Sequence, residues 1–355
     1  MNPNPIFLPA PVRQVILPGM HFSFKRSWLV LLLLGFAPLM GSDRLGDIEF
    51  FGYKDLDIEK IRKALPVRPG AEYSDGVKNA VRQAIVGALR KEPTDVAAVC
   101  CDERGNRLLF IGLPGASNQG FSYNPEPKGK ERLPSDIMDL YARLDHAIEA
   151  AVRKGGPAAE EDDSQGYSLI KEPRARALQL AVRQWAIKHE PELLRILEFS
   201  SSVDHRRVAS DALGYARQSH EQILALVRAA RDPDDDVRNN ATRALGVLVR
   251  SNAALGADIS PDTFIEMLNS GAWTDRNKGA ALLVQLTVGK ASNLLTKIRL
   301  MALDSLLEMA AWKRPSHAYF ARMVLGRVAG IPEERLQKLA WDGPVDTIIN
   351  AARSH

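Results

Sequence analysis

Cysteine is scarce in this chain of 355 residues. The two cysteines, Cys100 and Cys101, are adjacent, and a disulfide between neighbours would need a strained small ring. The sequence therefore holds neither a disulfide framework nor a zinc site. We interpret the pair as one buried small side chain and one surface thiol, and the alternative is a redox-active or intermolecular thiol.

Motifs that position catalytic groups are absent from the sequence. It has no Walker loop, no Gly-x-Gly-x-x-Gly, no Gly-x-Ser-x-Gly and no His-Glu-x-x-His. The seven histidines are scattered, and His205, beside Arg206, is interpreted as part of a helix start rather than as a general base. We therefore expect no catalytic residue, no metal site and no cofactor, and a protein that is not an enzyme.

A strong charge of one sign is also missing from the body of the chain. Lys and Arg number 47 and Asp and Glu number 43, which gives a net charge of +4. The excess lies in residues 1–42, which contain Arg13, Lys25 and Arg26 and no acid. The rest is nearly neutral, so no overall field would attract polyanions, and nucleic acid is not an expected partner.

The longest apolar run is too short for an ordinary membrane span. It extends over 13 residues from Trp28 to Met40, directly after Lys25-Arg26-Ser27. A bilayer span needs roughly 20 apolar residues, whereas a signal-peptide core has about this shorter length. Residues 1–42 are therefore predicted to be a signal peptide, and the protein to be exported to the periplasm or cell envelope. The alternative is an uncleaved anchor that associates with the membrane through residues 28–40.

Residues 47–114 have the pattern of a small α+β unit. Apolar residues alternate around Ile48 and Phe50, and they then recur at helical spacing, for example at Val77, Val81 and Ile85. A pair of apolar segments flanking a turn predicts a closing β-hairpin. The expected elements, in the order βααββ, lie over residues 48–50, 55–65, 77–89, 95–101 and 107–113.

This order, with the strand that ends at Gly52, the Pro69-Gly70 turn and the closing hairpin, resembles a POTRA domain over residues 47–113. The resemblance implies a module of the envelope of double-membraned bacteria that binds extended peptides along a sheet edge. Such domains usually precede an outer-membrane barrel. No series of alternating strands follows here, so barrel insertion is not implied. The alternative is a small module that packs against the rest of the chain.

Residues 115–168 are predicted to be a loop, a helix and an acidic linker. The loop ends near Leu133, and a helix opens at Pro134-Ser135-Asp136. Gly155-Gly156-Pro157 and the acidic tract Glu160-Glu161-Asp162-Asp163 follow. We interpret the tract as a solvated tether. Calcium binding is the alternative, but the alternating ligands and central glycine of an EF-hand loop are missing.

From residue 172 the sequence repeats. Copies of the pattern acid-x-Arg-x-x-Ala, the last two degenerate, begin at Glu172, Asp204, Asp236, Asp275 and Arg299. The first three copies are 32 residues apart, and the fourth is aligned with Asn277 at the arginine position. Partner helices with matching apolar positions are predicted between the copies, over residues 193–197, 223–227 and 264–268. Each unit is then a pair of helices that buries its faces only by stacking on the next pair.

The charged residues that recur in the pattern are interpreted as structural. Asp236 or a neighbouring residue can cap the helix that follows, and Arg238 can reach an acid of the adjacent unit. Such contacts would form a ladder along the stack. Ala241 and its equivalents are small enough to let neighbouring helices approach closely.

Residues 231–246 resemble a short bacterial HEAT repeat of the kind found in phycobilin-lyase-like proteins, and the resemblance covers residues 172–331. It implies a mainly α fold, with an α-solenoid of HEAT-type helical hairpins over residues 169–355 beside the small N-terminal α+β domain. The second helices of HEAT hairpins line a concave face, which binds partners. The candidate partner-binding residues there are Arg207, Asp211, Asn239, Arg243, Arg250 and Lys278.

Two functions are compatible with these features. The first is a non-catalytic protein-protein interaction scaffold of the cell envelope, which binds a protein partner through the concave face of the HEAT stack. The alternative, by likeness to the lyase-like proteins, is a lyase-like or accessory enzyme that handles a small molecule in the HEAT groove. A catalytic groove needs convergent titratable groups, and the candidate residues include no evident nucleophile and base, which favours the scaffold.

Overall fold

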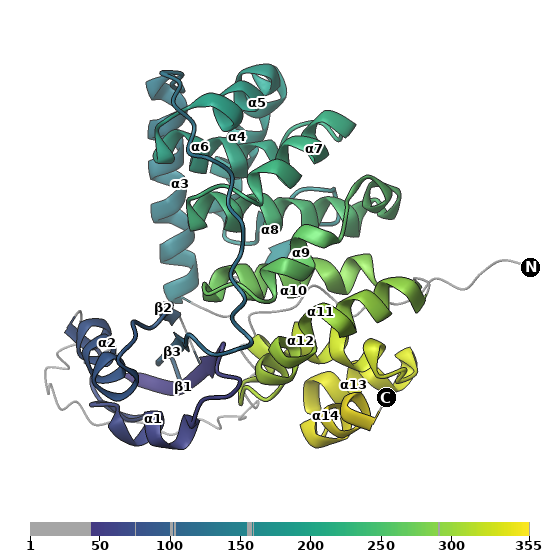
Figure 1. Ribbon diagram of the computed structural model, residues 1–355. Helices are drawn as coiled ribbons and strands as arrows, with labels where there is room; N and C mark the ends of the chain where they lie inside the picture. Colours follow the sequence, from purple (N-terminus) through teal and green to yellow (C-terminus); the bar gives the residue numbers. More distant parts are fainter. Residues whose placement is uncertain are drawn as a thin grey trace, which may run out of the picture.

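The computed structural model describes residues 44–74, 76–99, 102, 104–154, 158, 160–289 and 292–354. The protein is mainly helical and carries a small N-terminal sheet (Figure 1). The predicted signal peptide and both cysteines lie outside the described residues. Within the described part, no helix combines the length and apolar character needed to cross a membrane.

The N-terminal unit has the predicted order of elements. These are β1 (Leu45–Phe51), α1 (Ile58–Ala64), α2 (Gly76–Leu89), β2 (Asp95–Val99) and β3 (Arg107–Gly112). Strand β3 lies in the middle of the sheet, parallel to β1 and antiparallel to β2. Helices α1 and α2 bury Ile61, Val81 and Ile85 against Ile48 and Ile111 of the sheet. Side chains alternate between the two faces of a strand, so the apolar residues on one face of the sheet form a core with α1 and α2.

The opposite face of this sheet packs on the helical part of the chain. The Phe110 ring lies 5.1 Å from the ring of Trp273 and 4.9 Å from that of Trp312, between ring centroids. The indole N–H of Trp312 donates a hydrogen bond of 3.0 Å to the Phe50 carbonyl. Phe51 and Phe110 belong to the same buried cluster as the helices, so one apolar core continues from the sheet into the helices.

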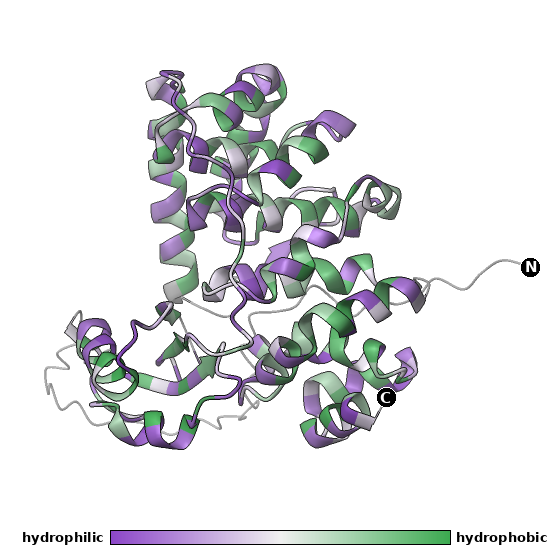
Figure 2. Cartoon of the chain, in the orientation of Figure 1, coloured by the Kyte–Doolittle hydropathy of each residue, from purple (hydrophilic) through white to green (hydrophobic). Residues whose placement is uncertain are grey.

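The helical part consists of pairs of packed helices. They are α3 (Ser135–Lys154), α4 (Pro173–Lys188), α5 (Glu190–Phe199), α6 (Val203–Leu213), α7 (His220–Ala229), α8 (Asp235–Ser251), α9 (Asp262–Met267), α10 (Trp273–Leu286), α11 (Ser292–Ala310), α12 (Pro315–Val328), α13 (Glu333–Asp342) and α14 (Val345–Ser354). Helices α4, α6, α8, α10 and α12 each contact the next in this series, and α5, α7, α9 and α11 pack beside them. Apolar residues lie between the helices, as Figure 2 shows, and we call this part the helical array.

A ladder of buried ion pairs connects α6, α8 and α10. Arg206 forms two contacts with Asp232, of 2.8 and 3.1 Å, and Arg238 forms two with Asp275, of 2.7 and 3.1 Å. The prediction that Arg238 reaches an acid of the next unit is therefore confirmed. The N-cap of α8 is Asp234, whose side chain accepts hydrogen bonds from two backbone amides, as predicted for this neighbourhood.

The predicted alignment of the fourth repeat is wrong by one residue. Arg206 and Arg238 each donate to the carbonyl six residues before them, and in α10 the residue that does so is Arg276, through a bond to the Ser270 carbonyl, rather than Asn277. Gly279 then takes the place of Ala241 in the contact with the preceding helix. A Cβ atom there would lie 2.8 Å from the Met267 Cβ, so the position requires glycine.

The fifth predicted copy, which contains Arg299 and Ala302, lies on α11 rather than on the helix that continues the series. Helix α12 packs on α10, and α11 packs beside α9 and α12. The backbone of α11 is also non-helical at Ala302, with φ −140° and ψ 16°. The pattern at this place therefore marks a kinked first helix instead of a second helix.

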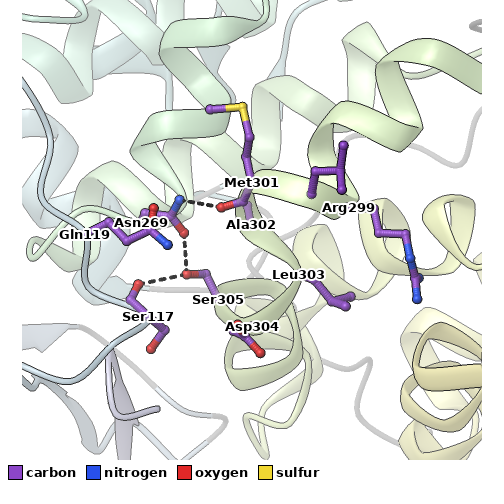
Figure 3. Close-up of a pocket in the computed structure, with 10 residues that line it drawn as sticks. Ser117, Gln119, Asn269, Arg299, Met301, Ala302, Leu303, Asp304 and Ser305 are labelled. Carbon is purple, nitrogen blue, oxygen red and sulfur yellow. Dashed lines mark hydrogen bonds between the residues drawn. The ribbon is translucent and has the colours of Figure 1, made fainter. Parts of the chain in front are cut away.

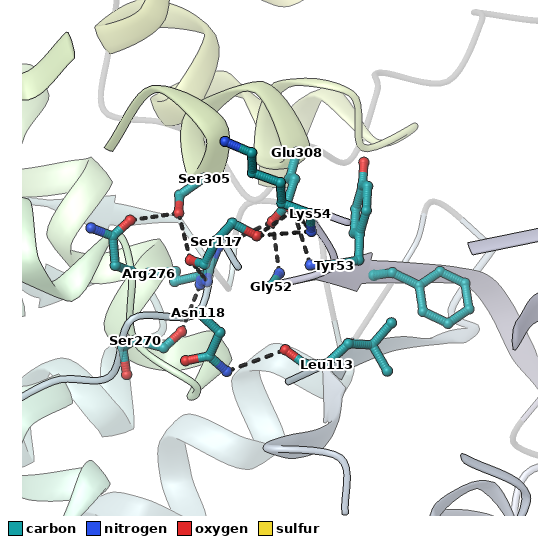
Figure 4. Close-up of polar contacts among 12 residues, drawn as sticks. Gly52, Tyr53, Lys54, Leu113, Ser117, Asn118, Ser270, Arg276, Ser305 and Glu308 are labelled. Carbon is teal, nitrogen blue, oxygen red and sulfur yellow. Dashed lines mark hydrogen bonds and ion pairs between the residues drawn. The ribbon is translucent and has the colours of Figure 1, made fainter. Parts of the chain in front are cut away.

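A buried carboxylate fastens the N-terminal unit to the array (Figure 4). Glu308 of α11 accepts hydrogen bonds from the backbone amides of Gly52, Tyr53 and Lys54, at 2.7, 2.9 and 2.9 Å. It also accepts one of 2.5 Å from the Ser117 hydroxyl. Gly52 has a φ of +70°, which favours glycine and turns these amides toward the carboxylate. Burial raises the pKa of Glu308.

The loop after β3 runs along the array from α11 to α5 before it reaches α3 (Figure 1). The Ser117 carbonyl accepts from Arg276, the Asn124 amide donates to the Arg231 carbonyl at 2.7 Å, and the Leu133 amide donates to His205 Nδ1 at 2.8 Å. The loop therefore binds successive units in the reverse of their sequence order. His205 lies in the first turn of α6, as predicted, and its ring also accepts this hydrogen bond from the loop.

Candidate functional site

The residues predicted to bind a partner lie on α6, α8 and α10, which pack on one another in that order, and we call the face that these residues form the second-helix face. Arg207 and Asp211 belong to α6, Asn239, Arg243 and Arg250 to α8, and Lys278 to α10. Two other segments of the described part of the chain contact this face. They are α3 and the hairpin of β4 (Glu161–Asp162) and β5 (Leu169–Ile170). The predicted site is therefore in contact with segments of its own chain.

Arg243 is the centre of the charge cluster on this face. Its guanidinium forms a very short contact with the Glu161 carboxylate and donates to the Ser168 hydroxyl at 3.1 Å. It also lies 3.9 Å from the Asp211 carboxylate. The charge of Glu161 raises the pKa of the Arg243 guanidinium. For Glu161 itself, burial would raise the pKa of the carboxyl, but the attraction of Arg243 outweighs burial and lowers it.

Asp211 is a partly buried carboxyl with a phenol beside it. Burial raises its pKa, although the charge of Arg243 and a hydrogen bond of 3.2 Å from the Tyr141 hydroxyl of α3 both act in the opposite direction. Burial and the charge of Asp211 in turn raise the pKa of the Tyr141 hydroxyl. These two side chains join α3 to α6 at the centre of the second-helix face.

Lys278 brings a further cation to the same cluster. Burial, and then the repulsion of Arg243, lower the pKa of its ammonium to about 8, while Glu161 acts in the opposite direction. Among the described residues, none forms a hydrogen bond or ion pair with the Lys278 side chain. The cluster therefore contains a cationic group that the acids of the hairpin do not contact directly.

The remaining predicted residues lie around this centre. Arg250 pairs with Asp163 of the hairpin at 2.6 Å, and Arg207 pairs with Asp145 of α3 at 3.3 Å. The Asn239 side chain is hydrogen bonded within the array, to Asn240 and to Thr274. The structure thus brings Asp211, Arg243 and Lys278 together, whereas Asn239 makes contacts within the array.

Sequence reasoning missed the acids that meet these cations. The tract Glu160–Asp163 was predicted to be a solvated tether. Its middle residues, Glu161–Asp162, form β4, and Glu161 and Asp163 pair with arginines of the array. One signal could have indicated this contact. The four consecutive acids are opposite in charge to the arginines of the predicted face, with which carboxylates form strong hydrogen bonds. Tyr141 and Tyr215, which border the cluster, carried no comparable signal in the sequence.

A second candidate is a cavity of about 300 Å³ beside the kink of α11 (Figure 3). Asn269 donates to the Met301 carbonyl at 2.8 Å and accepts from the Ser305 hydroxyl at 2.6 Å, so its amide group supports the kink. Leu300 beside it is 81% exposed. The cavity offers hydrogen-bonding groups and an apolar rim, but the polar groups of Asn269 and Ser305 are already paired with each other.

One group of carboxylates in the described residues is compact enough to hold a cation. The carboxylate oxygens of Asp234, Asp235 and Asp236 lie within 4.8 Å of one another. Asp234 uses its oxygen to cap α8, and the other two acids are exposed in the first turn of that helix, where negative charge is favourable. The arrangement is accounted for by helix capping.

No protein-family model matches the chain, and no curated protein is significantly similar to it.

Proposed function

We propose that the protein is a non-catalytic interaction scaffold of the cell envelope, in which a HEAT-type α-solenoid binds a protein partner through its second-helix face. The observation that carries this proposal is the cluster of Arg243, Arg250 and Lys278 on that face. Three cations on adjacent helices, partly exposed and bordered by tyrosines, have the composition of a protein-binding surface, in which arginine and tyrosine contribute most.

The solenoid component of the proposal is supported by the ladder. Arg206, Arg238 and Arg276 make the same carbonyl contact in successive helices, and each has an acid of the following unit within reach. Repetition of one contact from unit to unit is typical of repeat proteins, whose units contact only their neighbours. The POTRA-like component is supported by the βααββ order and by the mixed sheet with β3 at its centre.

The N-terminal unit packs against the array, and we propose that it acts in this docked position. Trp312 and Arg314 bind β1 through an indole and a guanidinium, and the Glu308 carboxylate binds the residues that follow this strand. Strand β2 is the edge strand on the other side of β3 from β1, and we propose this edge as the place where an extended peptide would pair, as the POTRA resemblance implies.

Affinity capture tests the scaffold. The full chain would be used as bait on an envelope fraction, in parallel with Arg243→Ala and with Arg228→Ala, which removes an arginine that is 58% exposed away from the second-helix face. We expect one set of proteins retained by the wild type and by Arg228→Ala, and lost with Arg243→Ala. Equal retention by all three baits would contradict binding through this face.

The alternative, an enzyme or enzyme accessory that handles a small molecule, is favoured by one observation. Lys278, Asp211 and Tyr141 are convergent titratable groups whose pKa values are all displaced by burial. If this alternative holds, Lys278→Met should abolish turnover of a metabolite in an extract and leave protein capture unchanged. Loss of capture without any turnover in the wild type would argue for the scaffold.

A further inference from the structure

The two arms of the β4–β5 hairpin are attached to the array by different forces. In the second arm, Leu169 and Ile170 are buried in the apolar core, and the Ile170 amide donates to Gln179 of α4 at 2.7 Å. In the first arm, the Glu161 side chain is 44% exposed. Because burial of apolar surface is the main stabilising contribution, the second arm is the firmly held one.

The first arm, residues 160–163, is attached by charge. Its ion pairs join Glu160 to Lys171, Glu161 to Arg243, Asp162 to Arg176 and Asp163 to Arg250. Partly exposed ion pairs of this kind contribute little to stability, since water and salt compete for both charges. The backbone adds a short ladder against β5, in which the Lys171 amide donates to the Glu160 carbonyl at 2.8 Å. An arm held in this way can be exchanged for another segment of similar charge.

We propose that residues 160–163 are an internal ligand of the second-helix face, and that the partner displaces them with an acidic, extended segment of its own. This inference rests on the proposed function and names the chemistry of the partner. The incoming carboxylates would pair with Arg243 and Arg250, and the incoming backbone would take the place of β4 beside β5. Lys278 offers that segment a further cation, with which the internal arm makes no ion pair.

The inference predicts competition between the internal arm and an acidic peptide. The probe is a fluorescent synthetic peptide with the sequence of residues 158–166, and its control has Gln and Asn in place of the four acids. The proteins are the full-length wild type and Glu161→Gln/Asp163→Asn, which keeps the arm but removes its two pairs with α8. The matched control is Glu266→Gln. It neutralises an acid that pairs with Arg231 elsewhere on the array.

We expect the double variant to bind the acidic peptide at least tenfold more tightly than the wild type or Glu266→Gln. Binding should weaken as salt is raised, and adding Arg243→Ala to the double variant should reduce the affinity at least tenfold. Equal affinity in all proteins, or equal binding of the neutral peptide, would overturn the inference.

The single variant Asp163→Asn keeps the Glu161 pair and guards against a failure of the double variant to fold. It should bind the acidic peptide with intermediate affinity, and no gain over the wild type would count against the inference.

The result of this experiment can be separated from the test of the proposed function. Capture of a partner that depends on Arg243, with no gain in peptide binding, would refute the acidic segment alone. Peptide binding with no Arg243-dependent capture would refute the scaffold.

Discussion

The ladder between helices allows the sharpest stability prediction. Arg238→Ala removes a guanidinium whose side chain is 3% exposed, and it leaves the Asp275 carboxylate, which is 1% exposed, without its cation. The carbonyls of Asp232 and Pro233 lose their donor at the same time. Asp275 keeps one hydrogen bond, of 2.6 Å from the Ser270 hydroxyl.

The expected loss in the free energy of unfolding follows from burial. Removing one partner of a buried ion pair typically costs about 3 to 5 kcal/mol, because the remaining charge stays desolvated. The surviving bond from Ser270 makes the lower half of that range the better expectation for Arg238→Ala. By contrast, Arg228→Ala removes one side of a pair of 3.8 Å whose side chains are 58% and 49% exposed, and should change stability by about 0.5 kcal/mol or less.

Urea unfolding followed by helical circular dichroism measures both effects on the full chain. The double variant Arg238→Met/Asp275→Leu tests the cause, because replacing both charges by apolar groups removes the unpaired carboxylate. It should be more stable than Arg238→Ala. If Arg238→Ala and Arg228→Ala lose the same stability, or if the double variant is the least stable, the ladder is not a stabilising element and the reasoning fails.

Three further predictions concern other sites. Ala241→Asp should cost about 3 to 5 kcal/mol by burying an unpaired carboxylate at a fully buried position, and hydrogen exchange should report lost protection in α6, α8 and α10 before α1 and α2. Glu308→Ala should cost about 2 to 4 kcal/mol, since three backbone amides lose their acceptor, and should raise exchange at Gly52 and Tyr53 more than Glu308→Gln does. Lys278→Met should stabilise the protein by about 1 to 3 kcal/mol at pH 7, because its ammonium has a pKa of about 8 in the folded protein against an ordinary value of 10.5. Between these values the unfolded chain binds more protons, so the stability of the wild type rises with pH and the advantage of Lys278→Met should shrink. A difference between the two proteins that stays constant from pH 7 to pH 10.5 would contradict the assignment.

Local repetition made the ladder predictable. Asp204, Arg206 and Ala209 recur with the same spacing at Asp236, and residues in equivalent positions of stacked units meet equivalent neighbours. The alignment failed where the spacing changed. Between Arg238 and Arg276 the chain inserts a short 3-10 helix, Ala253–Asp258, which lengthens this unit. The local signals conflict here, because Asp275 and Ala280 favour Asn277 as the ladder residue, whereas the arginine of the pattern favours Arg276. Only the packing against the next helix decides between the two alignments.

The contacts of the β4–β5 hairpin with the second-helix face could not be predicted in the same way. Glu161 lies 82 residues from Arg243 in sequence, and Asp163 lies 87 residues from Arg250. The loop before α3 has the composition of a linker, yet its backbone amides and carbonyls find partners along the array, as buried backbone groups must. Composition therefore indicates a segment without regular structure, and it does not indicate whether that segment packs on the fold.

Helix α8 explains why similar ion pairs serve different ends in this protein. Arg238 and Arg243 are five residues apart, so at about 100° per residue their side chains leave the helix roughly 140° apart. Arg238 enters the contact with α10, where both partners are almost fully buried, and exchange with an outside carboxylate would first require the helices to separate. Arg243 meets the hairpin where its side chain is 29% exposed and that of Glu161 is 44% exposed, so water already reaches the pair. Because opening such a pair exposes no apolar core, exchange on the second-helix face can proceed while the ladder keeps the array intact.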